Sequence, residues 1–247
     1  MQTTKHQFAV YVAHLTDLLK THPRTLRLTD QDLVHRIGHV LRLAVNEDCI
    51  LFDQTVHALV SITNIAKKQV DGEVKTVNKN VLVEPSITVL LPLLKREALE
   101  EALYSCVELG ANTVQLMTTQ KVQRSWGGEK ELQRMHNIMV AAAEQSKNFA
   151  FPVLQSPVSL PDALAKVPST STKLVAAVQG QPLLPCLSGI AGKKNPLVIT
   201  FGPEGDFTQE EYRMLQDQHF TMCALTPTVL RAQQALVVLL GAVRSIT

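Results

Sequence analysis

The chain has 247 residues, 45% of them hydrophobic, which is enough for one large or two medium domains with a sizeable core. Its 24 basic and 22 acidic residues give a net charge of +2. This near balance of charges does not by itself indicate a nucleic-acid partner. No stretch reaches the roughly 18 apolar residues of a membrane helix, and residues 1–14 lack the features of a signal peptide, so we expect a cytoplasmic protein without membrane contact.

The four cysteines are scattered along the chain in mostly apolar surroundings. They are Cys49, Cys106, Cys186 and Cys223, and no two of them form a Cys-x-x-Cys pair. Free cysteine behaves mainly as a small hydrophobic residue. We therefore expect buried, reduced thiols and neither a metal site nor a disulfide.

Short β-prone runs separated by polar turns fill the first third of the chain. They are residues 8–12, 49–53, 58–66 and 74–83. One helix interrupts them, with apolar side chains at helical spacing between 33 and 41 and a capping-box-like start in which Asp32 follows Thr29 by three residues. This pattern predicts a small β-barrel or twisted sheet with an embedded helix over residues 1–84.

From Pro85 onward helix and strand patterns alternate, as is typical of a mostly parallel sheet with helices on its faces. An apolar helical stripe ends before Gly110, where a left-handed C-terminal residue is expected, and a strand follows at 113–117. A second helix is predicted over 129–146. The sequence thus predicts an α/β domain over residues 85–247.

The last third of the chain continues this alternation. Nearly apolar runs predict buried strands at 174–178 and 197–201, with a loop and at most a short helix at 181–195 between them. After the second strand and a Gly-Pro-Glu-Gly-Asp-Phe segment, Thr208 and Glu211 form a Thr-x-x-Glu capping box for a helix to about residue 218.

One more strand and helix complete the chain. A strand at 221–225 leads into a helix at 229–246 that is apolar nearly all round. Such a helix has to be buried, either against the sheet or against a partner subunit.

Two glycines are the first candidates for a ligand loop. Gly202 and Gly205 follow a buried parallel strand, at the place where open α/β sheets bind ligands. The motif is neither a Rossmann fingerprint nor a phosphate-binding P-loop, and a Gly-Pro turn between strand and helix is often only a turn. No Ser/His/Asp or Cys/His set indicates nucleophilic hydrolysis, and His35 and His39 lack an evident third metal ligand.

Two later segments carry a more specific resemblance. Residues 201–207, Phe-Gly-Pro-Glu-Gly-Asp-Phe, and 225–235, Leu-Thr-Pro-Thr-Val-Leu-Arg-Ala-Gln-Gln-Ala, resemble the paired signature of the RsmE family, whose members methylate N3 of a uridine in 16S ribosomal RNA. Residues 39–42, 108–110 and 142–146 resemble further family segments in the same order. The likeness extends over nearly the whole chain.

The resemblance implies a PUA-like β-barrel domain followed by a SPOUT α/β domain whose C-terminus threads a trefoil knot, an exception to the rule that chains are unknotted. It also implies a homodimer that acts on 16S ribosomal RNA or the small ribosomal subunit. S-adenosyl-L-methionine would be held by backbone groups of three loops. The matching positions are Val178, Phe201, Gly202, Pro203, Gly205, Leu225, Thr226, Pro227, Val229 and Leu230.

Few side chains are needed for the implied reaction, because it depends mainly on in-line positioning and loss of the N3 proton. Arg231 is the candidate cation for the developing imide anion or a nearby phosphate, and Glu204 is a candidate for orientation. A charge at a helix N-terminus is the alternative for Arg231. The candidate contacts to RNA phosphates are His35, Arg36, Arg42 and Lys147, each of which also fits an ordinary solvated residue.

Several positions depart from the family pattern. The family usually has glycine at Asp206 and Thr226, arginine at Lys121, Asn148 and Thr228, and Glu-Thr at 233–234. Less backbone freedom at Thr226 would affect a cofactor loop directly. The departures leave two alternatives open: a non-catalytic RNA-binding or ribosome-assembly protein with a degenerate SPOUT fold, and an enzyme that acts on another base or RNA.

Overall fold

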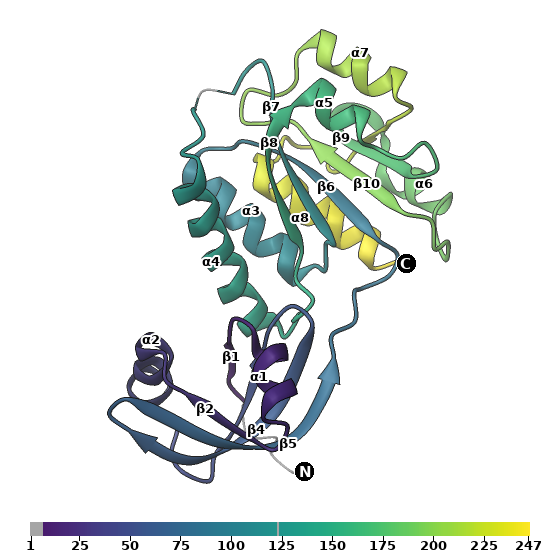
Figure 1. Ribbon diagram of the computed structural model, residues 1–247. Helices are drawn as coiled ribbons and strands as arrows, with labels where there is room; N and C mark the ends of the chain where they lie inside the picture. The colour runs from purple at the N-terminus through teal and green to yellow at the C-terminus, as the bar shows by residue number, and fades with distance from the viewer. Residues whose placement is uncertain (1–6, 123) are drawn as a thin grey trace. The chain divides into compact units, whose positions relative to one another are not determined.

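The computed structural model describes residues 7–122 and 124–247 (Figure 1). Two compact units are present. One contains the chain up to Val81 together with Ala143–Ala150, and the other contains Leu82–Ala142 and Phe151–Thr247. The short piece Ala143–Ala150 therefore belongs with the first unit, and the domain limits 1–84 and 85–247 stay a prediction.

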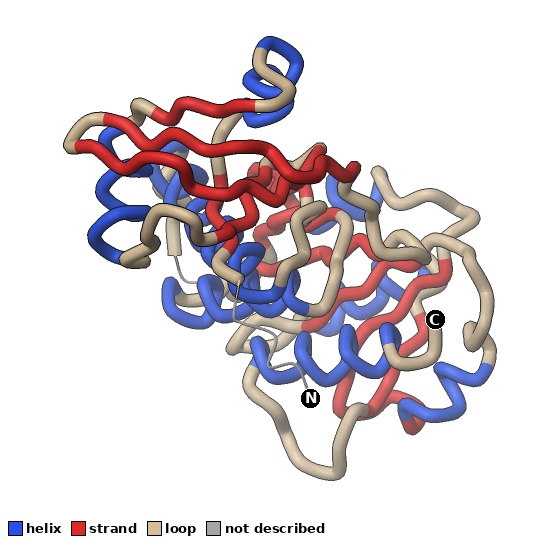
Figure 2. Tube along the Cα trace, turned by 90° about the horizontal axis from the view of Figure 1, so that it is seen from below, coloured by secondary structure: helices blue, strands red, loops and turns tan. Residues whose placement is uncertain are grey.

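A mixed sheet of five strands, in the order β1-β3-β4-β5-β2, forms the first unit. The strands are β1 (Ala9–Tyr11), β2 (Thr25–Leu28), β3 (Asp48–Phe52), β4 (Val56–Ala66) and β5 (Gln69–Lys79). β1 is parallel to β3, and the other pairs, among them the long pair β4 and β5 in Figure 2, are antiparallel. The sequence pattern predicts all of these strands except β2, whose four residues are too few for a clear alternation.

Two short helices and a π-helical turn accompany this sheet: α1 (Leu15–Thr21), α2 (Gln31–His35) and η1 (Arg36–Val40). The predicted cap at Thr29 is wrong, because the extended residue before α2 is Asp30, whose Oδ1 accepts a hydrogen bond from the Leu33 amide at 2.9 Å. The predicted single helix is also interrupted, since η1 widens the turn. Val40, expected on the inner face, is 62% exposed.

A parallel sheet of six strands, in the order β11-β9-β10-β6-β7-β8, forms the second unit. The strands are β6 (Ile87–Pro92), β7 (Thr113–Thr118), β8 (Val153–Ser159), β9 (Thr172–Pro182), β10 (Leu197–Phe201) and β11 (Thr221–Ala224). The predicted strand at 197–201 is confirmed with its bounds. The sequence pattern did not predict β8, which contains Pro157. An edge strand such as β8 can contain proline, because one side of it has no neighbouring strand.

The described residues from 82 onward contain six helices: α3 (Arg96–Glu108), α4 (Glu129–Ser146), α5 (Leu160–Ala165), α6 (Leu183–Ser188), α7 (Gln209–Asp217) and α8 (Ala232–Arg244). The last turn of α4, from Ala143, belongs with the first unit. α5 and α7 cover one face of the sheet, where their apolar side chains share a core with Leu90, Val175 and Val198. α3 and α8 pack together on the other face, with α8 against β10 (Figure 1). The order β11-β9-β10 brings the ends of three strands to one edge of the sheet, under the start of α8.

Several helix signals in the sequence are confirmed. α4 has the predicted bounds, and Gly110 after α3 has the left-handed backbone expected there, with φ of 71°. The capping box of α7 is present, since Thr208 Oγ1 accepts from the Glu211 amide at 3.2 Å and the Glu211 carboxylate accepts from the Thr208 amide at 2.8 Å.

The last helix differs from its prediction in two ways. It begins at Ala232 rather than at residue 229, because Arg231 has an extended backbone (φ −63°, ψ 152°) and is the N-cap residue. Only one side of α8 is fully buried, through Leu236, Leu239 and Leu240 among others, while the other side is partly exposed. Within residues 7–122 and 124–247, none of the helices is both long and apolar enough to traverse a lipid bilayer.

Three of the four cysteines, Cys49, Cys106 and Cys223, are buried as predicted. Burial raises the pKa of Cys49 to about 12, which keeps this thiol protonated at neutral pH. Cys186 is the exception to the predicted burial, because α6 lies at the surface and leaves its side chain partly exposed.

Candidate active site

Residues in the middle of β9 and the segments that follow β10 and β11 meet the start of α3 and α8 around a cavity of about 590 Å³. The predicted strand 174–178 is therefore too short, because β9 continues to Pro182 and Val178 lies within it. This volume lies within the roughly 300–1,000 Å³ of sites that bind small molecules. We call it the central cavity. It lies entirely within the second unit, at the carboxyl ends of parallel strands, where α/β sheets bind their ligands.

Most of the residues predicted to hold a cofactor lie around this cavity. Its lining includes Val178, Phe201, Gly202, Pro203, Leu225, Thr226, Val229 and Leu230, and also the two predicted catalytic residues Glu204 and Arg231. Gly205 and Pro227 are not part of the lining. The carbonyl of Gly205 instead accepts a hydrogen bond from Lys121 Nζ at 2.9 Å, which directs it toward the segment after β7.

The loop after β10 depends on a close contact at Gly202. A Cβ at this position would lie 2.3 Å from Asp206 Oδ1 and 3.0 Å from Asp206 Cα, so no larger residue fits without moving the loop. Asp206 itself has a left-handed backbone, with φ of 58°, a conformation that aspartate tolerates better than most residues. This explains how a non-glycine residue occupies a position where the family usually has glycine.

Two hydrogen bonds hold the Asp206 carboxylate in place. Its Oδ1 accepts from the Phe207 amide and from the Tyr212 hydroxyl, both at 2.8 Å. Burial, with the hydrogen bond to Asp206 as a second cause, raises the pKa of Tyr212, so its hydroxyl stays a donor. Both side chains line the central cavity, and α7 thereby fixes the loop that follows β10.

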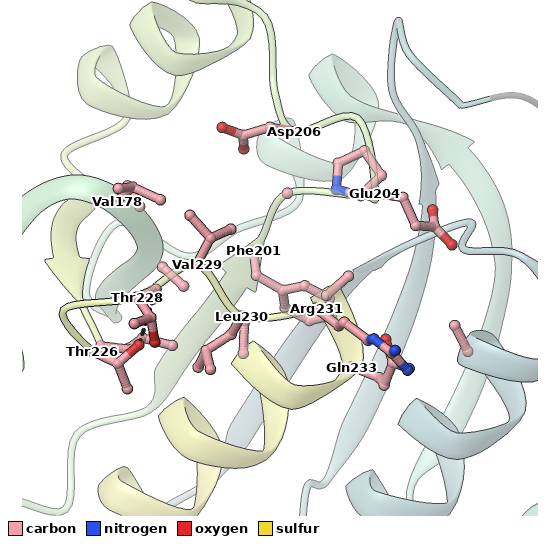
Figure 3. A pocket seen from close by; sticks show the side chains of 18 of the residues that line it. Val178, Phe201, Glu204, Asp206, Thr226, Thr228, Val229, Leu230, Arg231 and Gln233 are labelled. Carbon is pink, nitrogen blue, oxygen red and sulfur yellow. Dashed lines mark hydrogen bonds between the residues drawn. The ribbon is translucent and has the colours of Figure 1, made fainter.

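The loop after β11 is closed by a local hydrogen bond, from Thr226 Oγ1 to the Thr228 carbonyl at 2.7 Å (Figure 3). Thr226 is not among the residues with positive φ, so this turn does not need the backbone freedom of glycine. Val229 and Val178 reach the rim of the cavity and are 79% and 66% exposed. The loop therefore offers backbone groups and apolar side chains to a ligand.

Arg231 and Glu204 enter the cavity from opposite loops. Figure 3 shows Arg231 beside Gln233 at the start of α8, on the side of Glu204. The Arg231 side chain is exposed and has no hydrogen-bond or ion-pair partner in the described part of the chain. Glu204 is engaged, since its Oε1 accepts from the Lys95 amide at 2.9 Å and so ties the loop after β10 to the start of α3.

The charges around the central cavity are mostly negative. Four carboxylates line it, those of Glu97, Glu101, Glu204 and Asp206, against the two cations Lys95 and Arg231. Gln233 Nε2 donates to Glu101 Oε2 at 3.1 Å and fixes one of these carboxylates. A cavity of this sign attracts a positively charged small molecule.

Sequence reasoning did not identify Lys95, which precedes α3, or the α3 residues Glu97, Ala98 and Glu101, or Tyr212 from α7. A signal existed for the first group. These residues follow β6, and β6 is the neighbour of β10 in the sheet, so its carboxyl end lies at the same edge. Knowledge of the strand order was needed to use that signal.

The predicted RNA-contacting residues lie in the first unit, and two of them are already bound. Arg36 forms an ion pair with Glu144, and Lys147 Nζ donates to the Glu144 carbonyl at 2.9 Å. Burial lowers the pKa of Lys147. Arg42 is exposed, with a positive φ of 53°, and the His35 ring stacks on His39 with 5.1 Å between centroids.

A family model for the RNA methyltransferase domain matches residues 83–244. The chain is similar to ribosomal RNA small subunit methyltransferase E of Rickettsia conorii, with 26% identity over 225 residues that cover 89% of each chain. It is equally similar to the protein of the same name from Bacillus subtilis, with 26% identity over 243 residues and 94% of each chain covered. The resemblance drawn from the sequence motifs is confirmed by these matches.

Solved structures share the fold over nearly the full length. The crystal structure of a ribosomal RNA small subunit methyltransferase E from Neisseria gonorrhoeae, bound to S-adenosyl methionine, has a TM-score of 0.83 at 22% identity and covers 97% of this chain and 98% of its own. A protein from Legionella pneumophila in complex with the same cofactor has a TM-score of 0.82 at 24% identity, with 98% of each chain covered. The family model matches well over half of the residues of this chain, and the chain therefore belongs to the family of the RNA methyltransferase domain.

Proposed function

We propose that this protein is an S-adenosyl-L-methionine-dependent methyltransferase that modifies N3 of a uridine in the 16S ribosomal RNA of the small ribosomal subunit. The observation that carries the proposal is the central cavity, which is lined by residues from all three segments predicted to bind the cofactor. The similarity to proteins named ribosomal RNA small subunit methyltransferase E supports the substrate.

The residues around the cavity fit such a cofactor. Ala176, Ala177 and Leu230 offer an apolar surface for an adenosine, and the loops after β10 and β11 offer main-chain partners. The excess of carboxylates suits a molecule that carries a sulfonium and an ammonium group. When bound, S-adenosylmethionine supplies an electrophilic methyl group.

The side chains of this chain then have three tasks. Arg231, with its uncommitted guanidinium, stabilises the negative charge that develops on the uridine as the N3 proton leaves. Glu204 acts through position, because its hydrogen bond to the Lys95 amide holds the loop after β10 against α3. Gly202, Pro203, Leu225 and the other predicted cofactor residues that line the cavity hold and orient the methyl donor.

For the fold we propose a SPOUT domain with a C-terminal trefoil knot in the second unit. Close packing of the last segments supports this. A Cβ on Gly180 would lie 2.6 Å from the backbone of β11, and the Gly192 amide donates to the Ile246 carbonyl at 3.2 Å, so the end of the chain lies against the segment after α6. The mixed five-stranded sheet of the first unit supports a PUA-like barrel there.

The proposed assembly is a homodimer that acts in the cytoplasm, where small ribosomal subunits are found. The resemblance to the family supports the dimer, and Leu184 in α6, which is 77% exposed, is an apolar side chain that a partner subunit would cover. His35, Arg36, Arg42 and Lys147 remain the proposed phosphate contacts of the first unit. For Arg36 and Lys147 this requires that the Glu144 contacts be exchanged for phosphates.

Methyl transfer to ribosomal RNA tests the proposal. Small subunits that lack base methylation are incubated with the protein and labelled cofactor, and the RNA is digested and analysed by mass spectrometry. We expect one N3-methyluridine per subunit. Methylation of a different base would change the proposed target, and RNA binding without any transfer would instead support a non-catalytic assembly protein.

A further inference from the structure

A second hollow, which we call the basic groove, lies next to the central cavity in the second unit. It has a volume of about 540 Å³ and is lined by Lys95, Arg96, Arg124, Gly127, Lys130, Glu131 and Arg134. These residues come from the start of α3, the segment after β7 and the first turns of α4. Lys95 lines both hollows, so the two are adjacent.

The groove concentrates positive charge that the composition does not reveal. It contains five cations and one carboxylate, whereas the whole chain has 24 basic and 22 acidic residues. A local cluster of this kind attracts anions even when the net charge of the protein is close to zero. The sign is opposite to that of the central cavity.

The one carboxylate of the groove is already engaged. Glu131 forms an ion pair with Arg124, and its Oε2 accepts from the Gly127 amide at 2.7 Å. Both side chains are largely buried, with exposed fractions of 10% for Glu131 and 20% for Arg124. This pair therefore builds the wall of the groove and does not neutralise the remaining cations.

The other four cations are accessible. Arg134 contacts Glu100 Oε1 at 2.7 Å, and Arg96 reaches the same atom only at 3.9 Å, so one carboxylate serves two guanidinium groups. Arg96 and Arg134 remain 65% and 45% exposed. Lys95 and Lys130 are exposed and their ammonium groups have no ion-pair partner in the described residues.

We infer that the basic groove binds the phosphodiester backbone of the RNA strand that delivers its target nucleotide to the central cavity. The inference rests on the proposed function and adds a substrate-binding site to it. Phosphates are repelled by the acidic lining of the cavity and attracted by the neighbouring cations, so only the base has to enter. Phosphate contacts of this kind position a strand without reading its sequence.

The test uses the double variant Arg96→Ala, Lys130→Ala, which removes two exposed cations that lack a close ion-pair partner. The control is Lys193→Ala, Lys194→Ala, which removes the same charge from the exposed segment after α6, outside both hollows. Affinity for an RNA fragment that the unmodified protein methylates is measured by fluorescence anisotropy at several salt concentrations. Cofactor affinity is measured separately by calorimetry, and thermal unfolding verifies the fold.

We expect the groove variant to bind RNA about tenfold more weakly and its salt dependence, log K against log salt, to flatten by roughly 1.4, about 0.7 for each lost contact to a single strand. KM for RNA should rise while kcat and cofactor affinity stay unchanged. The charge-conserving double variant Arg96→Lys, Lys130→Arg should bind RNA like the unmodified protein. Unchanged RNA affinity and an unchanged salt slope in the double variant, with normal methylation, would refute RNA binding by the groove and leave the proposed function intact. Absence of cofactor binding in the unmodified protein would instead remove the proposed function.

Discussion

The central cavity and the basic groove share Lys95 but differ in the sign of the charges that line them. Four carboxylates and two cations line the cavity, whereas five cations and one carboxylate line the groove. A single site of either sign would attract one of the two ligands, the small cation or the polyanion, and repel the other. Two adjacent sites of opposite sign can attract both. The net charge of +2 is the sum of such local differences and hides them.

The division of labour makes the two regions separable by experiment. Changes in the cavity should alter turnover or cofactor affinity and leave the binding of RNA phosphates intact. Changes in the groove should have the reverse effect. Replacements in each region therefore test the separation.

Replacement Arg231→Ala should give the largest loss. Removing a cation that faces developing charge typically lowers kcat by about 10²–10³-fold, and we expect that loss here with cofactor affinity nearly unchanged. Single-turnover methyl transfer and calorimetry measure the two quantities. Gln234→Ala, an exposed neighbour at the start of α8, is the control and should behave like the unmodified protein. Equal turnover in both variants would refute the role of Arg231.

Replacement Gly202→Ala tests the shape of the cavity. The new Cβ would approach backbone atoms of Asp206 and Phe207 to 3.0 and 3.2 Å, and overpacking of this kind costs about 1–3 kcal/mol. We expect cofactor affinity to fall roughly tenfold to a hundredfold while affinity for RNA is retained. Gly241→Ala in α8, where a Cβ meets nothing within 4 Å, is the matched control. A cofactor affinity equal to that of the control would contradict the proposed loop geometry.

A smaller effect, on the free energy of unfolding, is expected when Glu131 in the wall of the groove is protonated at low pH. Burial opposes ionisation of Glu131, but hydrogen bonds from Arg124 and Gly127 outweigh it and lower the pKa of this carboxylate. Its contribution to stability is therefore complete above the pKa of an unfolded glutamate and is lost as the pH falls through the lower folded value. We expect about 1 kcal/mol or less.

Urea unfolding between pH 7 and about 3 measures this contribution by comparison with the variant Glu131→Gln. The unmodified protein should be the more stable of the two at neutral pH, and the difference should shrink on acidification. A difference that is independent of pH would show that the ionised pair does not stabilise the groove.

The sequence revealed the parts of the site that are local in the chain. The loops after β10 and β11 each follow a strand directly, so their motifs and the capping box at Thr208 could be read from consecutive residues. The residues of these two loops that line the cavity could be predicted for the same reason. The fold class followed from the alternation of strand and helix patterns.

The parts that sequence reasoning missed depend on the order of strands. Lys95 and Glu101 reach the cavity because β6 lies beside β10, although about a hundred residues separate them along the chain. The basic groove likewise gathers Arg96, Arg124 and Arg134 from separate segments. Arg36 pairs with Glu144, 108 residues further along the chain, a partnership that no local sequence pattern indicates.

Titration of the protein with S-adenosyl-L-methionine in a calorimeter tests the central claim most directly. We predict one site per chain with a micromolar dissociation constant, equivalent to about −8 kcal/mol, and an affinity roughly tenfold to a hundredfold weaker in Gly202→Ala. No measurable binding at millimolar cofactor would contradict it.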